Sequence, residues 1–228
     1  MRNLLLFFFS HRTLALIRWD IHFLGIRIKN VLFSRTTRLL KSIRERPGPL
    51  YLNLGSGPRG LTAAEWINID GFKDKNVHYL CDFSRPLPFD DETFNGIFCE
   101  HVLEHFTYEN GRKLLVECKR ILKKNGVLRI VVPDGNKILT SYFDEPKKIV
   151  EYKQVETGFP IEAVNTWFYQ RYEHQCIYDA AYLVDSLQKA GFSTAKASSF
   201  NTSLLNVGDI VLDDPKYSWE SLYVEAVK

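Results

Sequence analysis

A glycine-rich turn is the first feature of the sequence that could do chemistry. Gly55, Gly57 and Gly60 follow an apolar segment at 50–54 in the spacing G-x-G-x-x-G. Glycines in such a turn let the backbone approach a ligand closely, because no side chain intervenes. The connection from 60 to 66 is too short for a regular helix, so the helix that meets the pyrophosphate in a dinucleotide fold has no room here.

Two acids stand at the ends of the next two apolar segments. Asp70 follows the first, where a carboxylate can accept hydrogen bonds from both hydroxyls of a ribose. Asp82 follows the second, about one ribose-to-adenine length further on, and can accept from the adenine amino group. The pair predicts a nucleoside site without a pyrophosphate. The alternative for Asp70 is a turn-forming residue before Gly71.

Three histidines form the second group of candidate residues. His101 and His105 stand in the segment HVLEH, and His174 stands in RYEHQ. H-x-x-E-H is also the inverted zinc-protease signature, for which Glu173 is a candidate third ligand. The alternative is that Glu104 and His105 only cap and solvate the next helix. We favour the absence of a metal, because the segment follows a strand of a nucleoside-binding arrangement.

Alternating strands and helices position these residues. Strands are predicted at 50–54, 66–70, 77–82, 94–99, 127–132 and 218–227, and helices at 108–124 and 179–190. This alternation indicates an α/β fold with a mostly parallel sheet. Residues 134–176 are long, aromatic and irregular, and a connection of that length is usually functional.

Composition separates an arm from a domain. The 228 residues are 45% apolar and 25% charged, which excludes disordered, collagen-like and coiled-coil chains. Residues 1–46 carry ten Lys and Arg against two acids, and a Pro-Gly-Pro break at 47–49 follows. Leu14, Ile17, Ile21, Leu24 and Ile28 follow helical spacing, which predicts a basic amphipathic helix. This helix could lie on an anionic membrane surface or dock on its own domain. Binding of nucleic acid by the same charges is the third and least favoured alternative.

Four dispersed cysteines and the absence of a long apolar run favour a cytoplasmic protein, peripheral at the membrane if the arm is an anchor.

Several segments, in order, resemble class I S-adenosylmethionine (SAM)-dependent methyltransferases of the type-11 kind, and within them the small methyltransferases found with polysaccharide-biosynthesis enzymes. They are LNLGSG at 52–57, WINID at 66–70, PLPFDDETFN at 86–95, EHVLEH at 100–105, LKKNGVL at 122–128 and KAGF at 189–192. The resemblance implies a three-layer Rossmann-like sandwich with a seven-stranded sheet over 47–228, preceded by the helical arm 1–46.

The resemblance also assigns roles. The Gly55-Ser56-Gly57 loop would pass under the methionine part of SAM, Asp70 would bind the ribose, and Asp82 and Phe83 the adenine. Glu100 would face the methionine end and the substrate. Many relatives carry an acid where Asn53 stands, and Asn53 can still accept a hydrogen bond.

The implied reaction is methylation of a small-molecule or glycan acceptor, above all a sugar hydroxyl. A hydroxyl needs a base, and His101, His105 and His174 are the candidates. Residues 134–176 would form the acceptor lid. The alternatives are a nicotinamide-dependent sugar epimerase or reductase, and a SAM-binding module without activity.

Overall fold

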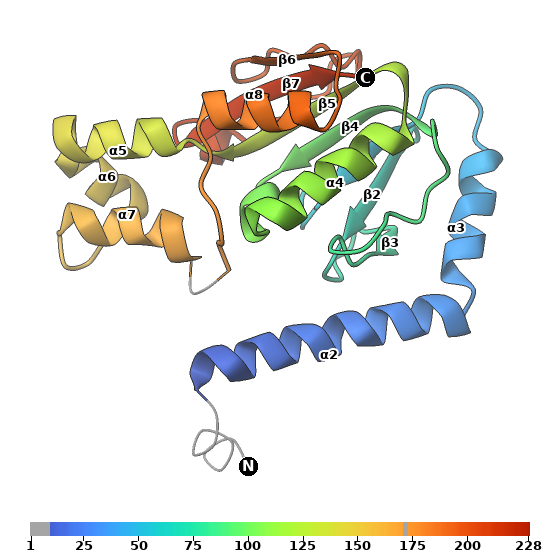
Figure 1. Cartoon of the computed structure of the whole chain (residues 1–228), viewed down its shortest axis with the longest axis horizontal. Coiled ribbons are helices and arrows are strands. Elements are labelled where there is room, and N and C mark those ends of the chain that lie inside the picture. Colours follow the sequence, from blue (N-terminus) through green and yellow to red (C-terminus); the bar gives the residue numbers. More distant parts are fainter. Residues whose placement is uncertain (1–9, 171–172) are drawn as a thin grey trace.

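The computed structural model describes residues 10–170 and 173–228, and it is a Rossmann-like α/β fold (Figure 1). The seven-stranded sheet has the order β3-β2-β1-β4-β5-β7-β6. Strands β1 to β5 run parallel, and β7 runs antiparallel to both β5 and β6. The predicted fold class, a mostly parallel sheet with N-terminal helices, is confirmed.

The strands are short and mostly buried. Their bounds are β1 Tyr51–Leu54, β2 Trp66–Asp70, β3 Tyr79–Leu80, β4 Phe94–Glu100, β5 Leu122–Pro133, β6 Thr194–Ala197 and β7 Ser221–Val227. The order reverses between β1 and β4, so a crevice is expected outside the carboxyl ends of these two strands. The glycine turn follows β1 and the segment 100–105 follows β4, which places both at this crevice.

One face of the sheet is covered by helices. α3 (Arg35–Arg44), α4 (Tyr108–Ile121) and α8 (Ala180–Lys189) share one core cluster with side chains of β1, β2, β4, β5 and β7. The opposite face is covered by the irregular segments around 61–63 and 200–212. The third layer therefore lacks helices at these places, in agreement with the short 60–66 connection.

Residues 135–169 form three helices, which corrects the prediction that this segment is irregular. α5 (Gly135–Asp144), α6 (Pro146–Lys153) and α7 (Pro160–Tyr169) form a side cluster to the left of the sheet in Figure 1. The Asp134 side chain caps α5, and a proline stands at the first position of α6 and of α7. Ile138, Ile149 and Trp167 are buried between the three helices.

The arm folds as two helices, α2 (His11–Leu32) and α3, joined at Ser34 in the left-handed conformation. Leu39 and Ile43 of α3 are buried in the main core, so this helix packs on the domain. α2 runs below β2 and β3 (Figure 1). Residues 1–9, part of the predicted arm, lie outside the described residues. The boundary at 46/47 stays a prediction, although the arm is not separate in space.

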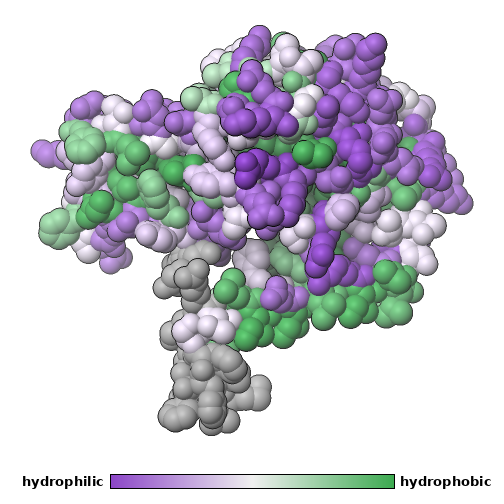
Figure 2. Space-filling model, viewed as in Figure 1, coloured by the Kyte–Doolittle hydropathy of each residue, from purple (hydrophilic) through white to green (hydrophobic). Residues whose placement is uncertain are grey.

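The apolar stripe of α2 faces away from the domain. Ile17, Ile21, Leu24 and Ile28 are exposed, whereas Ile26 and Asn30 are buried against it. In Figure 2 hydrophobic side chains gather along the lower edge, where α2 runs. Among the helices of the described ranges, none is long and apolar enough to cross a membrane.

Candidate active site

The glycine turn requires glycine at its first position. Gly55 has φ +76°, and a Cβ atom there would lie 2.0 Å from Cγ2 of Val102. The turn after β1 is therefore pressed against the turn after β4. Gly57 has φ +49° with no heavy atom within 4 Å of a Cβ position, which leaves open space above it. The buried Ser56 hydroxyl has no hydrogen-bond partner among the described residues.

Asp70 and Asn53 lie beside this turn. The Asp70 carboxylate accepts from the backbone N–H groups of Gly57 (2.8 Å) and Phe72 (2.7 Å). It therefore fixes the turn, and its partial exposure leaves lone pairs for a ribose. The buried Asn53 amide donates to Oδ1 of Asn68 at 3.0 Å, so it braces β1 against β2.

Asp82 is already paired in this structure. Its Oδ1 accepts from the backbone N–H (3.1 Å) and the hydroxyl (2.6 Å) of Ser84. Its Oδ2 accepts from the Arg27 guanidinium, which α2 brings to the site. Phe83 packs at the edge of the main core. The sequence singled out Asp82 but not its partner Arg27, which is 55 residues away.

α2 makes further contacts with the same region. Nε2 of His22 donates to the Gly71 carbonyl at 2.8 Å, and Nδ2 of Asn30 donates to the Leu80 carbonyl at 2.9 Å. The rings of His22 and Phe72 stack at 4.8 Å. The arm is thus one wall of the region beside the ends of β2 and β3.

Glu100 ends β4 beside the glycine turn. Its Oε2 accepts from Arg59 at 3.1 Å, and its Oε1 accepts from the Asp214 backbone N–H at 2.8 Å. Burial raises the pKa of the Glu100 carboxyl, against the opposing effect of these partners.

His101 follows with φ +52°, a left-handed conformation that is uncommon for a side chain of this size. Its Nδ1 donates to Oε1 of the fully buried Glu104 at 3.0 Å, and its Nε2 lies 3.1 Å from the Ser221 hydroxyl. Burial opposes protonation, but the hydrogen bond and charge of Glu104 outweigh it and raise the pKa of His101. The buried carboxylate holds the imidazole in one orientation, an arrangement that can serve as a general base.

His105 and His174 join this pair. Their rings lie 4.8 Å apart, and Glu104, His105 and His174 each offer a ligand atom within 4.8 Å of the others. The structure thus brings all three sequence-predicted histidines around Glu104. The inverted zinc-protease geometry is absent, because Leu103–His105 is a single 3₁₀ turn and His101 binds Glu104. Glu104 is a central residue that the sequence treated as a helix cap.

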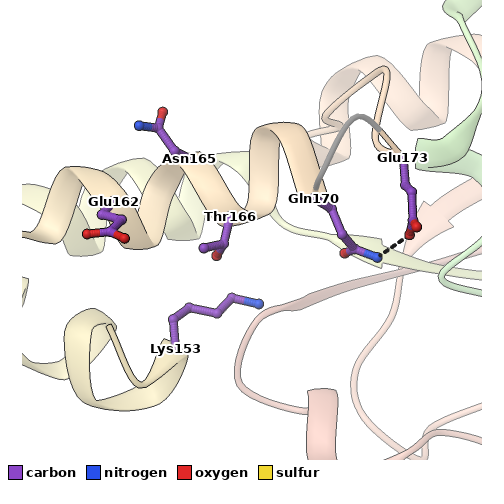
Figure 3. A pocket seen from close by; sticks show the side chains of 6 residues that line it. All are labelled: Lys153, Glu162, Asn165, Thr166, Gln170 and Glu173. Carbon is purple, nitrogen blue, oxygen red and sulfur yellow. Dashed lines mark hydrogen bonds between the residues drawn. The ribbon is translucent and has the colours of Figure 1, made fainter. Parts of the chain in front are cut away.

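A cavity of about 560 Å³ opens in the helical insertion, the segment that carries α5, α6 and α7 (Figure 3). Lys153 from α6 points toward Thr166 and Gln170 of the opposite wall, and Gln170 donates to Glu173. The lining is completed by Glu162 and Asn165. The cavity adjoins the histidines through Glu173, whose carbonyl accepts from Nδ1 of His105 at 3.2 Å.

SAM fits the glycine turn by three observations: the open space over Gly57, the unpaired hydroxyl of Ser56 and the accessible carboxylate of Asp70. At Asp82, the predicted acceptor for the adenine amino group, Arg27 already donates to one of the two oxygens.

Comparison with known proteins gives the family of this site. Residues 61–130 match the family model described as a methyltransferase domain, Methyltransf_11. An uncharacterized protein of Methanocaldococcus jannaschii is 28% identical over 163 residues, 61% of this chain and 67% of that protein.

Solved structures share the fold at low identity. The Burkholderia thailandensis 1,6-didemethyltoxoflavin-N1-methyltransferase, solved with its substrate and S-adenosylhomocysteine, is 13% identical with a TM-score of 0.51, over 96% of this chain and 91% of that one. A SAM-dependent methyltransferase from Archaeoglobus fulgidus is 16% identical with a TM-score of 0.48, over 85% and 92%.

The segment that matches the family model carries Asp70, Asp82 and the turn at 100–105, and it lies in a seven-stranded sheet of the methyltransferase type. Residues 61–130 are therefore a methyltransferase domain of the Methyltransf_11 type, and the chain is a SAM-dependent methyltransferase.

Proposed function

We propose that this methyltransferase transfers the methyl group of SAM to a hydroxyl group of a small-molecule or glycan acceptor, above all a sugar hydroxyl of the kind used in polysaccharide synthesis. In this reaction the acceptor oxygen forms a bond to the methyl carbon while the bond from carbon to sulfur breaks. The hydroxyl proton goes to a base. The sulfonium is already an activated donor, so alignment, exclusion of water and the base are what the chain must supply.

The observation that carries the proposal is the histidine cluster at the crevice. A base must lie within hydrogen-bond reach of the hydroxyl, and a histidine works near neutral pH. His101, His105 and His174 surround Glu104 directly beyond β4, and Val102 in the same turn touches Gly55 of the cofactor loop. An acceptor between the loop and the cluster would have the methyl donor on one side and a base on the other.

The cofactor would be held by the residues at the ends of β1, β2 and β4. Gly55, Ser56 and Gly57 would pass under its methionine part and Asp70 would bind its ribose. Asp82 and Phe83 would contact the adenine, and Asn53 and Glu100 would support the loop from the ends of β1 and β4.

The cavity in the insertion supports a hydroxyl-rich acceptor. Its six lining residues are all polar or charged, and together they offer donors and acceptors to several hydroxyl groups. A charged lining does not suit a purely apolar acceptor. We assign residues 134–176 to the acceptor side of the site and residues 47–228 to the methyltransferase domain.

The outward face of α2 supports contact with an anionic lipid surface or a lipid-linked acceptor. Its exposed apolar side chains include Leu16, Ile21, Val31 and Leu32, and the exposed cations Arg18 and Lys29 stand among them. Apolar burial together with cations near anionic headgroups is how an interfacial helix binds. We therefore propose a cytoplasmic protein that is peripheral at a membrane and does not act on nucleic acid.

The test is turnover of methyl-labelled SAM with a panel of nucleotide sugars and lipid-linked glycans. We expect methylation of at least one sugar hydroxyl, and a His101→Ala variant that binds SAM but has lost turnover. Binding of SAM without turnover on any acceptor would favour the SAM-binding module without activity. Calorimetry with NAD and with SAM addresses the nicotinamide alternative: binding of NAD but not SAM would overturn the proposal.

A further inference from the structure

Three groups with free electron pairs converge beyond β4. The Glu104 side chain is fully buried, and its Oε2 has no hydrogen-bond partner among the described residues. His105 and His174 each bring a ring nitrogen, and one ligand atom from each of the three residues lies within 4.8 Å of the others. His174 comes from the far end of the insertion, so the cluster exists only in the folded chain.

The hydrogen bonds decide which nitrogen of each ring is free. Nδ1 of His105 lies 3.2 Å from the Glu173 carbonyl, and Nδ1 of His174 lies 2.6 Å from the Trp167 carbonyl. A carbonyl only accepts, so both Nδ1 atoms carry the proton. The Nε2 atom of each neutral ring then has an unshared electron pair. Metal-binding histidines show this arrangement, with the distal N–H on a backbone carbonyl.

The Glu104 carboxylate is oriented by a third histidine, His101. Oε1 of Glu104 accepts from Nδ1 of His101, which in turn contacts Ser221. One oxygen is therefore oriented by a neighbouring side chain, while the other is buried and has no hydrogen-bond partner among the described residues. Leaving a buried carboxylate oxygen beside two imidazole electron pairs is costly, and a bound cation removes that cost.

We propose that Glu104, His105 and His174 bind one divalent transition-metal ion such as Zn²⁺, Mn²⁺ or Co²⁺. Two imidazoles and one carboxylate suit these ions, whereas Mg²⁺ and Ca²⁺ prefer all-oxygen sites. Three protein ligands leave coordination positions open, as in catalytic and not structural metal sites. On the proposed function, an open position would hold the acceptor oxygen and make its hydroxyl more acidic.

The test is a titration of the untagged, chelator-treated full chain with Co²⁺, followed by visible absorption, and with Zn²⁺ in competition. We expect one ion per chain and displacement of Co²⁺ by Zn²⁺. Glu104→Gln retains the size of the side chain, and His105→Ala removes a partly exposed ligand. Each should weaken binding about 100-fold or more. The matched control is His22→Ala, a histidine on α2 outside the cluster, which should bind as the wild type does.

The proposal would be overturned if the wild type bound no stoichiometric ion, or if Glu104→Gln and His105→Ala bound the ion as tightly as the wild type does. The three residues would then share a proton and not a metal ion. Thermal unfolding of the metal-free variants reports whether they fold. If His105→Ala does not, the wild type and Glu104→Gln still decide the result. The titration uses neither SAM nor an acceptor. Turnover without a metal would therefore overturn only the role of the ion at the acceptor oxygen, and metal binding without turnover would count only against the proposed function.

Discussion

We propose that Arg27 on α2 competes with the adenine of SAM for Asp82, so removing Arg27 should tighten SAM binding. Oδ1 of Asp82 is taken by Ser84, so Oδ2 would be the oxygen left for the adenine amino group. The Arg27 guanidinium already donates to that oxygen. In an Arg27→Met variant the apolar stem stays in place while the competing donor is gone.

The size of the effect follows from the exposure of the pair. A hydrogen bond to a charged group contributes about 1.5–3 kcal/mol, and exposed ion pairs contribute at most about 1 kcal/mol. The Asp82 side chain is 6% exposed but that of Arg27 is 40% exposed, so solvent screens the pair and the lower range applies. If SAM no longer has to displace an ion pair that contributes about 1 kcal/mol, its Kd should be roughly 5-fold lower.

The assay is calorimetric titration of SAM into the wild type, Arg27→Met and Lys29→Met. Lys29 is an exposed cation on the same helix, so its variant changes the net charge equally without touching Asp82. We expect tighter binding in Arg27→Met alone. A higher Kd in Arg27→Met would show that the arm helps to build the adenine pocket. An equal change of the Kd in both variants would show that the effect comes from the net charge and not from the contact with Asp82.

Three further predictions concern the loop, the core and the arm. Asp70→Ala should weaken SAM binding by roughly 1.5–3 kcal/mol, because the carboxylate fixes Gly57 and, on our proposal, binds the ribose; unchanged affinity in calorimetry would contradict this role. Arg129→Met should lower the free energy of unfolding in urea by about 3–5 kcal/mol, because the fully buried Asp213 would lose its charged partner; a loss below about 1 kcal/mol would show that water reaches it. An Ile21→Glu and Leu24→Glu double variant should no longer float with anionic liposomes yet bind SAM as before; flotation equal to that of the wild type would exclude the outer face of α2 as the contact.

The sheet and the cofactor loop could be predicted because their signals are local. Apolar runs that end in glycine or an acid indicate strands and their carboxyl ends, and a parallel sheet brings those ends to one edge. That reasoning joined the glycine turn, Asp70 and Asp82 in one predicted nucleoside site, whereas the prediction for Glu100 came from the family resemblance. β3 is shorter than predicted, and β6 was missed because its four residues are mostly exposed and carry no apolar run.

The histidine cluster could be predicted only in part. His101, His105 and His174 were singled out as bases, but their meeting around Glu104 depends on a contact between residues 70 positions apart. The backbone makes that contact: the Glu104 carbonyl accepts from the N–H groups of Gln175 and Cys176. Contacts of this kind have no periodicity in the sequence, so local pattern could not supply them.

The arm shows a different limit of sequence reasoning. Helical spacing predicted the apolar stripe of α2 correctly, and the two interpretations, membrane surface or domain, both assumed that the stripe faces the partner. In the structure the domain holds the opposite face through polar groups, Arg27 on Asp82, His22 on Gly71 and Asn30 on Leu80, and the stripe remains exposed. One helix therefore contacts the ends of β2 and β3 with one face and leaves its apolar face exposed. If a lipid surface displaces α2 from Asp82, vesicles and SAM must strengthen each other's binding by the same factor, because coupling between two binding events is reciprocal.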